Sequence, residues 1–349
     1  LRTRAAAKCC RWTPFFTGSR EKGAHVLATS AHSSVWRNYG WAACTTILRL
    51  LMTEAAPIAL FAYNRPEHLR RAVDALRRNP LATLSDLHVF SDGPRTVEDA
   101  PRVREVRAFL KSIDGFRSVT LHERDRNFGL AASVINGVTG LCETAGQIIV
   151  VEDDLRVAPG FLTYLNNALE RYRAEPKVMQ ISAHMFPVDV PVREDAFFLP
   201  FVSSWGWATW DRAWQKFDPV AAGYAQLKAD ARRRRAFNMD GAYDYFSMLA
   251  AQLEGKVDSW AIRWNLSVFM NGGLVLYPKK SLVENEGFDG SGVHCRGEAL
   301  DQAIDPALIP EHLPSPAIDL EAMEAVFDYF RARRSPRGRL HTLWARLFG

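Results

Sequence analysis

Three consecutive carboxylates, Glu152, Asp153 and Asp154, directly follow the apolar run "IIVV" at residues 148–151. Such a run is typical of a buried strand, and adjacent carboxylates at its end repel one another and are costly to bury unless a cation compensates them. Mg²⁺ and Mn²⁺ prefer oxygen ligands, usually one or two carboxylates together with phosphate oxygens and water. The acidic cluster therefore predicts a divalent-cation site that also holds a nucleotide diphosphate. The structural alternative is that Asp153 and Asp154 cap a following helix.

Polar residues also follow two other strand-like runs. Asn64 and Arg65 come after residues 57–63, "PIALFAY", and Asp92 comes after residues 87–91, "LHVFS". In an open parallel sheet, ligands bind in the crevice beyond the carboxyl ends of the strands. If these strands are parallel, their polar residues and the acidic cluster gather at one edge of the sheet, which is the predicted binding site.

The elements that would position these residues alternate in type along the first part of the chain. Short apolar runs are separated by helical patterns of ten or more residues, a rhythm typical of βαβ crossovers and a largely parallel sheet. At 349 residues the chain could form one domain of unusual size or two packed lobes. The predicted strands are 57–63, 87–91, 118–123 and 147–151, and the predicted helices are 66–79, 99–112 and 129–144.

The rhythm changes after Pro176. Strands and helices no longer alternate regularly, and an aromatic-rich stretch, "WGWATWDRAWQKF", begins at Trp205. The sequence as a whole predicts the α/β class, with a Rossmann-like, mostly parallel central sheet flanked by helices. In this second half, strands are predicted at 178–183, 196–204 and 274–278, and helices at 224–237, 244–256, 260–271 and 318–333.

Three sequence blocks occur in an order that resembles a known family. The blocks are "AYNRP" (62–66), "FSDGP" (90–94) and "VVEDDLRVAPGF" (150–161). The last resembles the metal-binding acidic motif of GT-A-fold glycosyltransferases, closest to the animal N-acetylglucosaminyltransferase I family, and the whole looks like bacterial glycosyltransferases of the family 2 type. The resemblance covers about residues 57–295 and weakens after Pro176. It implies a GT-A fold with an acceptor-side C-terminal half.

The resemblance also implies roles for four residues that match the motifs of the family. Arg65 would contact the nucleotide, and Asp92 would hydrogen-bond the uracil ring. Asp153 would meet the hydroxyls of the sugar or the ribose, and Asp154 would bind the metal, Mn²⁺ or Mg²⁺, directly.

The catalytic base is the point at which the chain departs from the family. The resembled enzymes carry their base in a "DDW" block, apparently as its second acid, but this chain has Asp258, Ser259 and Trp260 there. A carboxylate is the usual base for the acceptor hydroxyl, so the base is assigned to Asp258. The alternative is that Asp258 is an ordinary helix N-cap.

Four tryptophans occur within ten positions, and they can be interpreted either as core residues or as residues that bind the acceptor. Trp207, Trp210 and Trp214 are spaced i, i+3 and i+7, which favours core packing of one helix face. Similar "GW" elements border the acceptor site in the resembled family, and an aromatic ring there could stack on a sugar. Trp205 and Trp207 are the predicted acceptor-binding residues.

A Gly-rich stretch at residues 285–295, "NEGFDGSGVHC", contains His294. Many related enzymes close a C-terminal loop over the diphosphate, and a histidine there can ligate the metal or touch phosphate. His294 is therefore a candidate metal ligand. Asp289, bracketed by glycine, fits either a functional residue or a turn.

These observations predict a metal-dependent hexosyl- or N-acetylhexosaminyltransferase of bacterial polysaccharide biosynthesis. It would move a sugar from a nucleotide donor, a UDP-sugar, to a glycan or lipid-linked acceptor, and the resemblance implies inversion of configuration. A sugar nucleotidyltransferase is one alternative, although such enzymes open with a Gly-rich loop where this chain reads "FAYNRPEHL". A catalytically inactive GT-A-like binding module is the other.

The expected organisation has four parts. Residues 52–176 form a nucleotide-sugar-binding half, residues 177–313 an acceptor-binding and catalytic half, and residues 314–349 a C-terminal helical tail. Residues 1–51 show no sustained periodicity and lack the order of a secretory signal. We expect them to be disordered or a non-native extension, with the natural start at Met52.

The distribution of charge and the number of cysteines indicate which partners and which cellular compartment to expect. The net charge of +5 comes from residues 1–51, which hold eight Lys or Arg and one acid; the rest carries 36 bases and 38 acids. A nucleic-acid partner for the body of the chain is therefore not expected. Cys142 and Cys295 are too few for a disulfide framework, which favours the cytoplasm. The basic tail, residues 336–349, predicts either a surface helix or peripheral contact with the inner face of a membrane.

Overall fold

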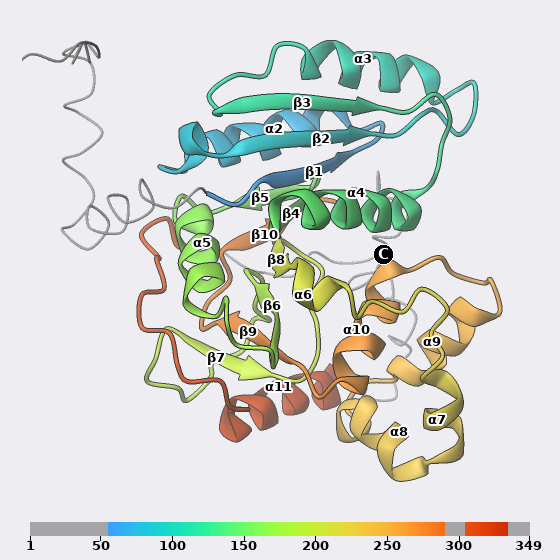
Figure 1. Ribbon diagram of the computed structural model, residues 1–349, viewed down its shortest axis with the longest axis vertical. Helices are drawn as coiled ribbons and strands as arrows, with labels where there is room; N and C mark the ends of the chain where they lie inside the picture. Colours follow the sequence, from blue (N-terminus) through green and yellow to red (C-terminus); the bar gives the residue numbers. More distant parts are fainter. Residues whose placement is uncertain (1–54, 290–303, 334–349) are drawn as a thin grey trace, which may run out of the picture. The chain divides into compact units, whose positions relative to one another are not determined.

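An eight-stranded sheet forms the centre of the computed structural model, which describes residues 55–289 and 304–333 (Figure 1). The strand order is β3-β2-β1-β4-β8-β6-β9-β7, and six of these strands run parallel to one another. The two exceptions are β8, between β4 and β6, and β7 at one edge. The strands are β1 (Ile58–Ala62), β2 (Asp86–Ser91), β3 (Ser118–Glu123), β4 (Gln147–Glu152), β6 (Val178–Ser182), β7 (Ala196–Leu199), β8 (Trp207–Trp210) and β9 (Leu274–Pro278).

Helices cover both faces of the sheet. β1 shows why, because all five of its residues are buried and alternate residues enter different cores. Ile58 and Leu60 pack in the core under α2 (Pro66–Arg77), α3 (Ala100–Leu110) and α5 (Phe161–Arg171). Ala59 and Phe61 pack in the core under α4 (Leu130–Ala145), α10 (Trp260–Met270) and α11 (Leu320–Arg333). The predicted α/β class, with a mostly parallel sheet flanked by helices, is confirmed, and it is consistent with a GT-A fold.

Shorter elements complete the described part of the chain. A second sheet consists of β5 (Leu155–Val157) and β10 (Val283–Asn285), which pair antiparallel. Strands from both predicted halves, 52–176 and 177–313, contribute to the main sheet. The remaining helices are α6 (Asp211–Trp214), α7 (Tyr224–Ala229), α8 (Ala231–Phe237), α9 (Tyr245–Leu253) and the 3₁₀ turns η2 (Ala82–Leu84) and η3 (Met239–Gly241).

The structure corrects three sequence-based expectations about local elements. No helix directly follows the acidic cluster: β5 begins at Leu155 and α5 only at Phe161, so capping of a helix by Asp153 and Asp154 is wrong. The predicted helix 224–237 is two helices, because the Asp230 carboxylate accepts the backbone N–H groups of the first turn of α8.

The third correction concerns the tryptophans. Trp207 and Trp210 lie in strand β8, so they point to opposite faces of the sheet and enter different cores. Trp214 belongs to the short helix α6 and shares the core of Trp207. The interpretation of the three residues as one helix face is therefore wrong, whereas their burial in the core is confirmed.

Several expectations fall outside the described residues. These are the N-terminal extension, 1–51, and the membrane contact of residues 336–349. Among the residues that the structure describes, no helix is both long and apolar enough to cross a membrane.

One buried polar side chain ties helix α10 to the sheet. Gln180, in the middle of β6, is fully buried. Its Nε2 donates to the Ser203 carbonyl at 2.7 Å, and its Oε1 accepts from Trp264 Nε1 of α10 at 2.7 Å. Since buried polar groups are costly to leave unpaired, this amide fixes the position of α10 on its face of the sheet.

We expect Gln180→Leu to lower the free energy of unfolding by roughly 2–4 kcal/mol, because it leaves the Ser203 carbonyl and the Trp264 indole N–H buried without partners. Chemical denaturation of the two proteins measures this loss. The exposed Gln215→Leu is the matched control and should change stability by less than about 0.5 kcal/mol. Equal stability of Gln180→Leu and the parent would contradict this role of the amide.

Candidate functional site

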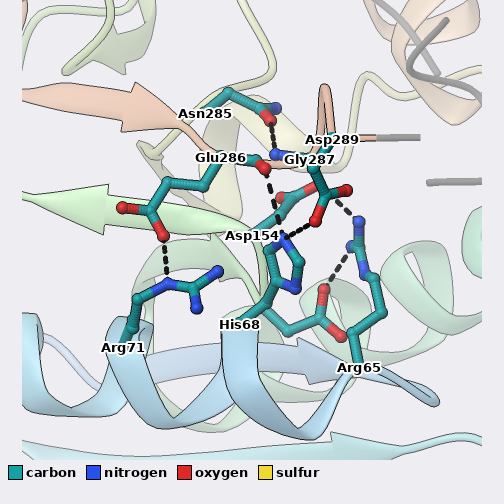
Figure 2. A network of polar contacts seen from close by, with 9 residues as sticks. Arg65, His68, Arg71, Asp154, Asn285, Glu286, Gly287 and Asp289 are labelled. Carbon is teal, nitrogen blue, oxygen red and sulfur yellow. Dashed lines mark hydrogen bonds and ion pairs between the residues drawn. The ribbon is translucent and has the colours of Figure 1, made fainter. Parts of the chain in front are cut away.

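The guanidinium of Arg65 bridges two carboxylates of the acidic cluster. Because β1 and β4 are neighbouring parallel strands, with Phe61 opposite Glu152, the chain leaves both strands at the same edge of the sheet. One nitrogen of Arg65 pairs with Asp153 Oδ1, and the other lies 3.0 Å from Asp154 Oδ2. The structure thus brings three predicted site residues into direct contact at the predicted edge. Figure 2 shows Arg65 beside Asp154.

Burial makes this contact electrostatically strong. Asp153 is 2% exposed and Asp154 6% exposed. The pKa of Arg65 is raised: burial lowers it, but the charges of Asp153 and Asp154 outweigh that effect. Burial raises the pKa of Asp153 in spite of the charge of Arg65. Burial, and after it the like charge of Asp154, raises the pKa of Glu152 well above its usual value. One cation therefore compensates a cluster of three acids, and the cluster remains short of positive charge.

Asp154 keeps one oxygen available for a cation. Its Oδ1 is buried and has no hydrogen-bond partner among the residues that the structure describes, whereas Oδ2 is held by Arg65. Among the described residues, no group of three or more His, Cys, Asp or Glu could hold a metal ion by itself. This donor set fits a Mg²⁺ or Mn²⁺ ion that takes one carboxylate from the protein and its other ligands from phosphate and water. It does not fit a closed structural metal site.

A segment distant in sequence lies against this centre. Residues 285–289 continue from β10, and the backbone N–H of Glu286 donates to the Asp154 carbonyl at 2.8 Å. A Cβ added to Gly287 would lie 2.5 Å from Asp154 Oδ2 and 3.1 Å from a guanidinium nitrogen of Arg65. Real Cβ atoms do not approach other atoms so closely, so only glycine fits at position 287 without a shift of the carboxylate.

Asp92 holds a turn next to the centre. Its carboxylate is 6% exposed and accepts the backbone N–H groups of Gly93, Phe128 and Gly129 at 2.9–3.1 Å. These bonds join the end of β2 to the start of α4. A uracil ring would have to share these acceptor oxygens, so the nucleobase contact of Asp92 stays a prediction beside this structural role.

The candidate base Asp258 lies on the surface just before α10. Its side chain is 65% exposed and pairs with Arg263 at 3.1 Å. The N-cap of α10 is Ser259, so Asp258 does not cap this helix. The next residue, Trp260, stacks on Trp207 with 5.0 Å between ring centroids, and Trp207 is opposite Val150 near the end of β4. The start of α10 therefore lies at the same edge of the sheet as the acidic cluster.

The two predicted acceptor-binding tryptophans are buried in this structure. Trp207 is fully buried between Trp214 and Trp260, and Trp205 is 6% exposed. The ring of Trp205 packs against His184 and against Phe288 of the 285–289 segment. Acceptor contact by Trp205 and Trp207 stays a prediction. The candidate metal ligand His294 lies outside the described residues.

Sequence reasoning missed two residues that shape the centre. Gly287 stands in the same Gly-rich stretch as the candidate metal ligand His294, but its own contact with the centre is not predicted from the sequence. His68 lies on the buried face of α2 among apolar residues. Nothing in the local sequence distinguishes it from a core position, because its partners are more than 200 residues away.

The chain was compared with protein families, curated proteins and solved structures. No protein-family model and no curated protein matches the sequence. Among solved structures, a mannosyltransferase from Pyrobaculum calidifontis, in complex with GDP-Man and Mn²⁺, has a TM-score of 0.37 and 13% identity, and the match covers 62% of this chain and 73% of that chain.

Two further solved structures give similar values. TarS from S. aureus has a TM-score of 0.37 and 10% identity, and the match covers 65% of this chain but only 36% of TarS. Glucosyl-3-phosphoglycerate synthase from Mycobacterium tuberculosis, in complex with Mn²⁺, UDP and its product, has a TM-score of 0.34 and 15% identity, with 56% and 72% covered. Likeness of this degree assigns neither a donor nor an acceptor to this chain.

We expect Arg65→Met to lower the free energy of unfolding by about 3–5 kcal/mol, because it leaves two buried carboxylates without their cation. Thermal or chemical denaturation measures the change. Arg70→Met on the same helix removes two exposed ion pairs and a cation–π contact with Phe109, and it should cost about 0–1 kcal/mol. A stability of Arg65→Met equal to that of Arg70→Met would contradict the compensation described here.

Proposed function

We propose that this chain is a metal-dependent glycosyltransferase that transfers a sugar from a nucleotide diphosphate donor, a UDP-sugar, to a saccharide acceptor. One observation carries the proposal. At the carboxyl ends of adjacent parallel strands, Arg65 bridges Asp153 and Asp154, and the buried Asp154 Oδ1 has no partner within residues 55–289 and 304–333. This is the edge at which open α/β sheets bind ligands, and its charges suit a diphosphate together with a divalent cation.

Each charged group at the edge has a task in donor binding. Asp154 would hold the metal through Oδ1, the oxygen that Arg65 leaves without a partner. Arg65 offers N–H donors to phosphate oxygens from a position fixed by Asp153. Asp153 would meet hydroxyls of the ribose or the sugar. When bound, the metal supplies Lewis-acid stabilisation of the negative charge on the departing diphosphate.

The acceptor hydroxyl needs a base, and Asp258 is our candidate. Its carboxylate would take the proton of the acceptor hydroxyl while the acceptor oxygen forms a bond to the anomeric carbon of the sugar. The bond between that carbon and the diphosphate oxygen breaks, and the nucleoside diphosphate leaves with the electron pair, so configuration inverts. The assignment is supported by Trp260, two residues further on, which stacks on Trp207 of β8.

The finer parts of the proposal follow from the resemblance and from the position of the elements. Residues 52–176 would bind the donor and residues 177–313 the acceptor, with Trp205 and Trp207 on the acceptor side. His294 would add a ligand to the metal or a contact to phosphate. A hexosyl or N-acetylhexosaminyl group is the proposed cargo, and a glycan or a lipid-linked saccharide at the inner face of the membrane is the proposed acceptor.

The donor site is tested by calorimetric titration of UDP into the full chain with and without Mn²⁺. We expect binding that requires Mn²⁺ and is abolished by Asp154→Ala, since this variant removes a buried carboxylate oxygen that has no partner among the described residues. Asp114→Ala, on a side chain that is 82% exposed, is the control and should bind like the parent. If UDP, GDP and dTDP all fail to bind the parent with Mn²⁺ present, the proposal is wrong.

The base is tested by the rate of UDP-sugar hydrolysis, which requires no knowledge of the acceptor. We expect Asp258→Asn to lower turnover by about 10²- to 10⁴-fold, the usual contribution of a general base, and to leave the affinity for UDP unchanged. Glu254→Gln changes a neighbouring exposed acid and should retain full turnover. Full turnover of Asp258→Asn would show that another group acts as the base.

A further inference from the structure

The 285–289 segment contacts both parts of the proposed site. At one point, Gly287 packs against Asp154 and Arg65 so closely that no side chain fits there. At the next residue, the ring of Phe288 packs edge-on against Trp205, a predicted acceptor-side residue, with 5.9 Å between centroids. The position of this short segment therefore affects the charged centre and the aromatic side of the site together.

His68 contacts the 285–289 segment on both sides of Gly287. Its Nε2 lies 3.2 Å from the Glu286 carbonyl and 3.2 Å from Asp289 Oδ2. Both partners are acceptors, so Nε2 carries the hydrogen that is shared between them. Figure 2 shows the imidazole of His68 rising from α2 to the residues that flank Gly287.

The contacts of His68 differ from the ion pairs that also hold the 285–289 segment. Glu286 also pairs through its side chain with Arg71 at 2.5 Å and with Arg156 at 3.0 Å, and these ion pairs fix the end of β10 to α2 and β5. They involve partly exposed side chains at the surface. His68 is only 7% exposed and reaches past Glu286 to Asp289, so it spans the residue that touches the charged centre.

Burying the imidazole of His68 costs free energy that packing of the ring in the core does not offset. A buried polar side chain must be hydrogen-bonded, and an apolar residue would fill the same face of α2 without that demand. Within the described part of the chain, the Glu286 carbonyl and the Asp289 carboxylate are the hydrogen-bond and ion-pair partners of His68, and both lie on the 285–289 segment. The polar contacts of the His68 side chain are therefore made with that segment.

The geometry points to His68 as a positioning residue of the donor site: it holds Gly287 against Asp154 and Arg65 and thereby keeps Asp154 aimed at the metal-bound diphosphate. This inference rests on the proposed function. His68 does not touch the donor itself. Groups that orient a metal-binding carboxylate from one shell further out typically change affinity or activity by about 10- to 100-fold when they are removed.

The test compares the parent, His68→Ala, His68→Gln and Arg70→Ala as full chains. Glutamine keeps an N–H donor at about the distance of Nε2, and Arg70→Ala changes the same helix without touching the segment. Two quantities are measured: the affinity for UDP with Mn²⁺, and the rate of amide hydrogen exchange in residues 285–289 without any ligand. The exchange rate reports the anchoring of the segment even if no nucleotide binds.

We expect His68→Ala to weaken UDP binding by about tenfold or more and to speed the exchange of residues 285–289. His68→Gln should restore most of the affinity and the protection, and Arg70→Ala should match the parent. The inference is overturned if His68→Ala binds UDP with the affinity of the parent, or if His68→Gln restores protection but no affinity. If the parent binds no nucleotide, the proposed function fails, and unchanged exchange in His68→Ala would then overturn the anchoring as well.

Discussion

The structure depends on charge compensation at the end of β4. Three acids follow a strand that is buried on both faces, and such a cluster cannot be desolvated without a cation. Arg65 is that cation, and it comes from the turn after the neighbouring strand. In the described part of the chain, the guanidinium pairs with two of the carboxylates and leaves Asp154 Oδ1 without a partner, which is the oxygen that we propose for a further cation.

Topology makes this arrangement available. A parallel sheet delivers the residue after each strand to the same edge, and the order β2-β1-β4 places Asp92, Arg65 and the acidic cluster side by side there. The antiparallel strand β8 then brings Trp207, and through it the start of α10, to that edge. The 285–289 segment covers the centre from a part of the chain more than a hundred residues further on.

Much of this could be predicted from the sequence, and the limits have physical causes. The first strands were located because apolar runs end in turn residues, and the gathering of Arg65 with the acids followed from the parallel rule. The direct ion pair between Arg65 and the two carboxylates is not predicted from the sequence, because either an arginine or a metal ion could compensate their charge. The spacing of Trp207, Trp210 and Trp214 wrongly predicted a single helix. The first two residues belong to strand β8 and the third to helix α6, which begins at Asp211. His68 and Gly287 could not be found, because their roles arise from contacts between distant segments.

The most direct test of the account is the anomalous diffraction of Mn²⁺ in crystals of the full chain grown with UDP. The account predicts an anomalous peak in coordination contact with Asp154 Oδ1, with the UDP diphosphate beside it and within reach of Arg65. A peak elsewhere, or UDP bound without manganese at the carboxyl ends of β1 and β4, would contradict it.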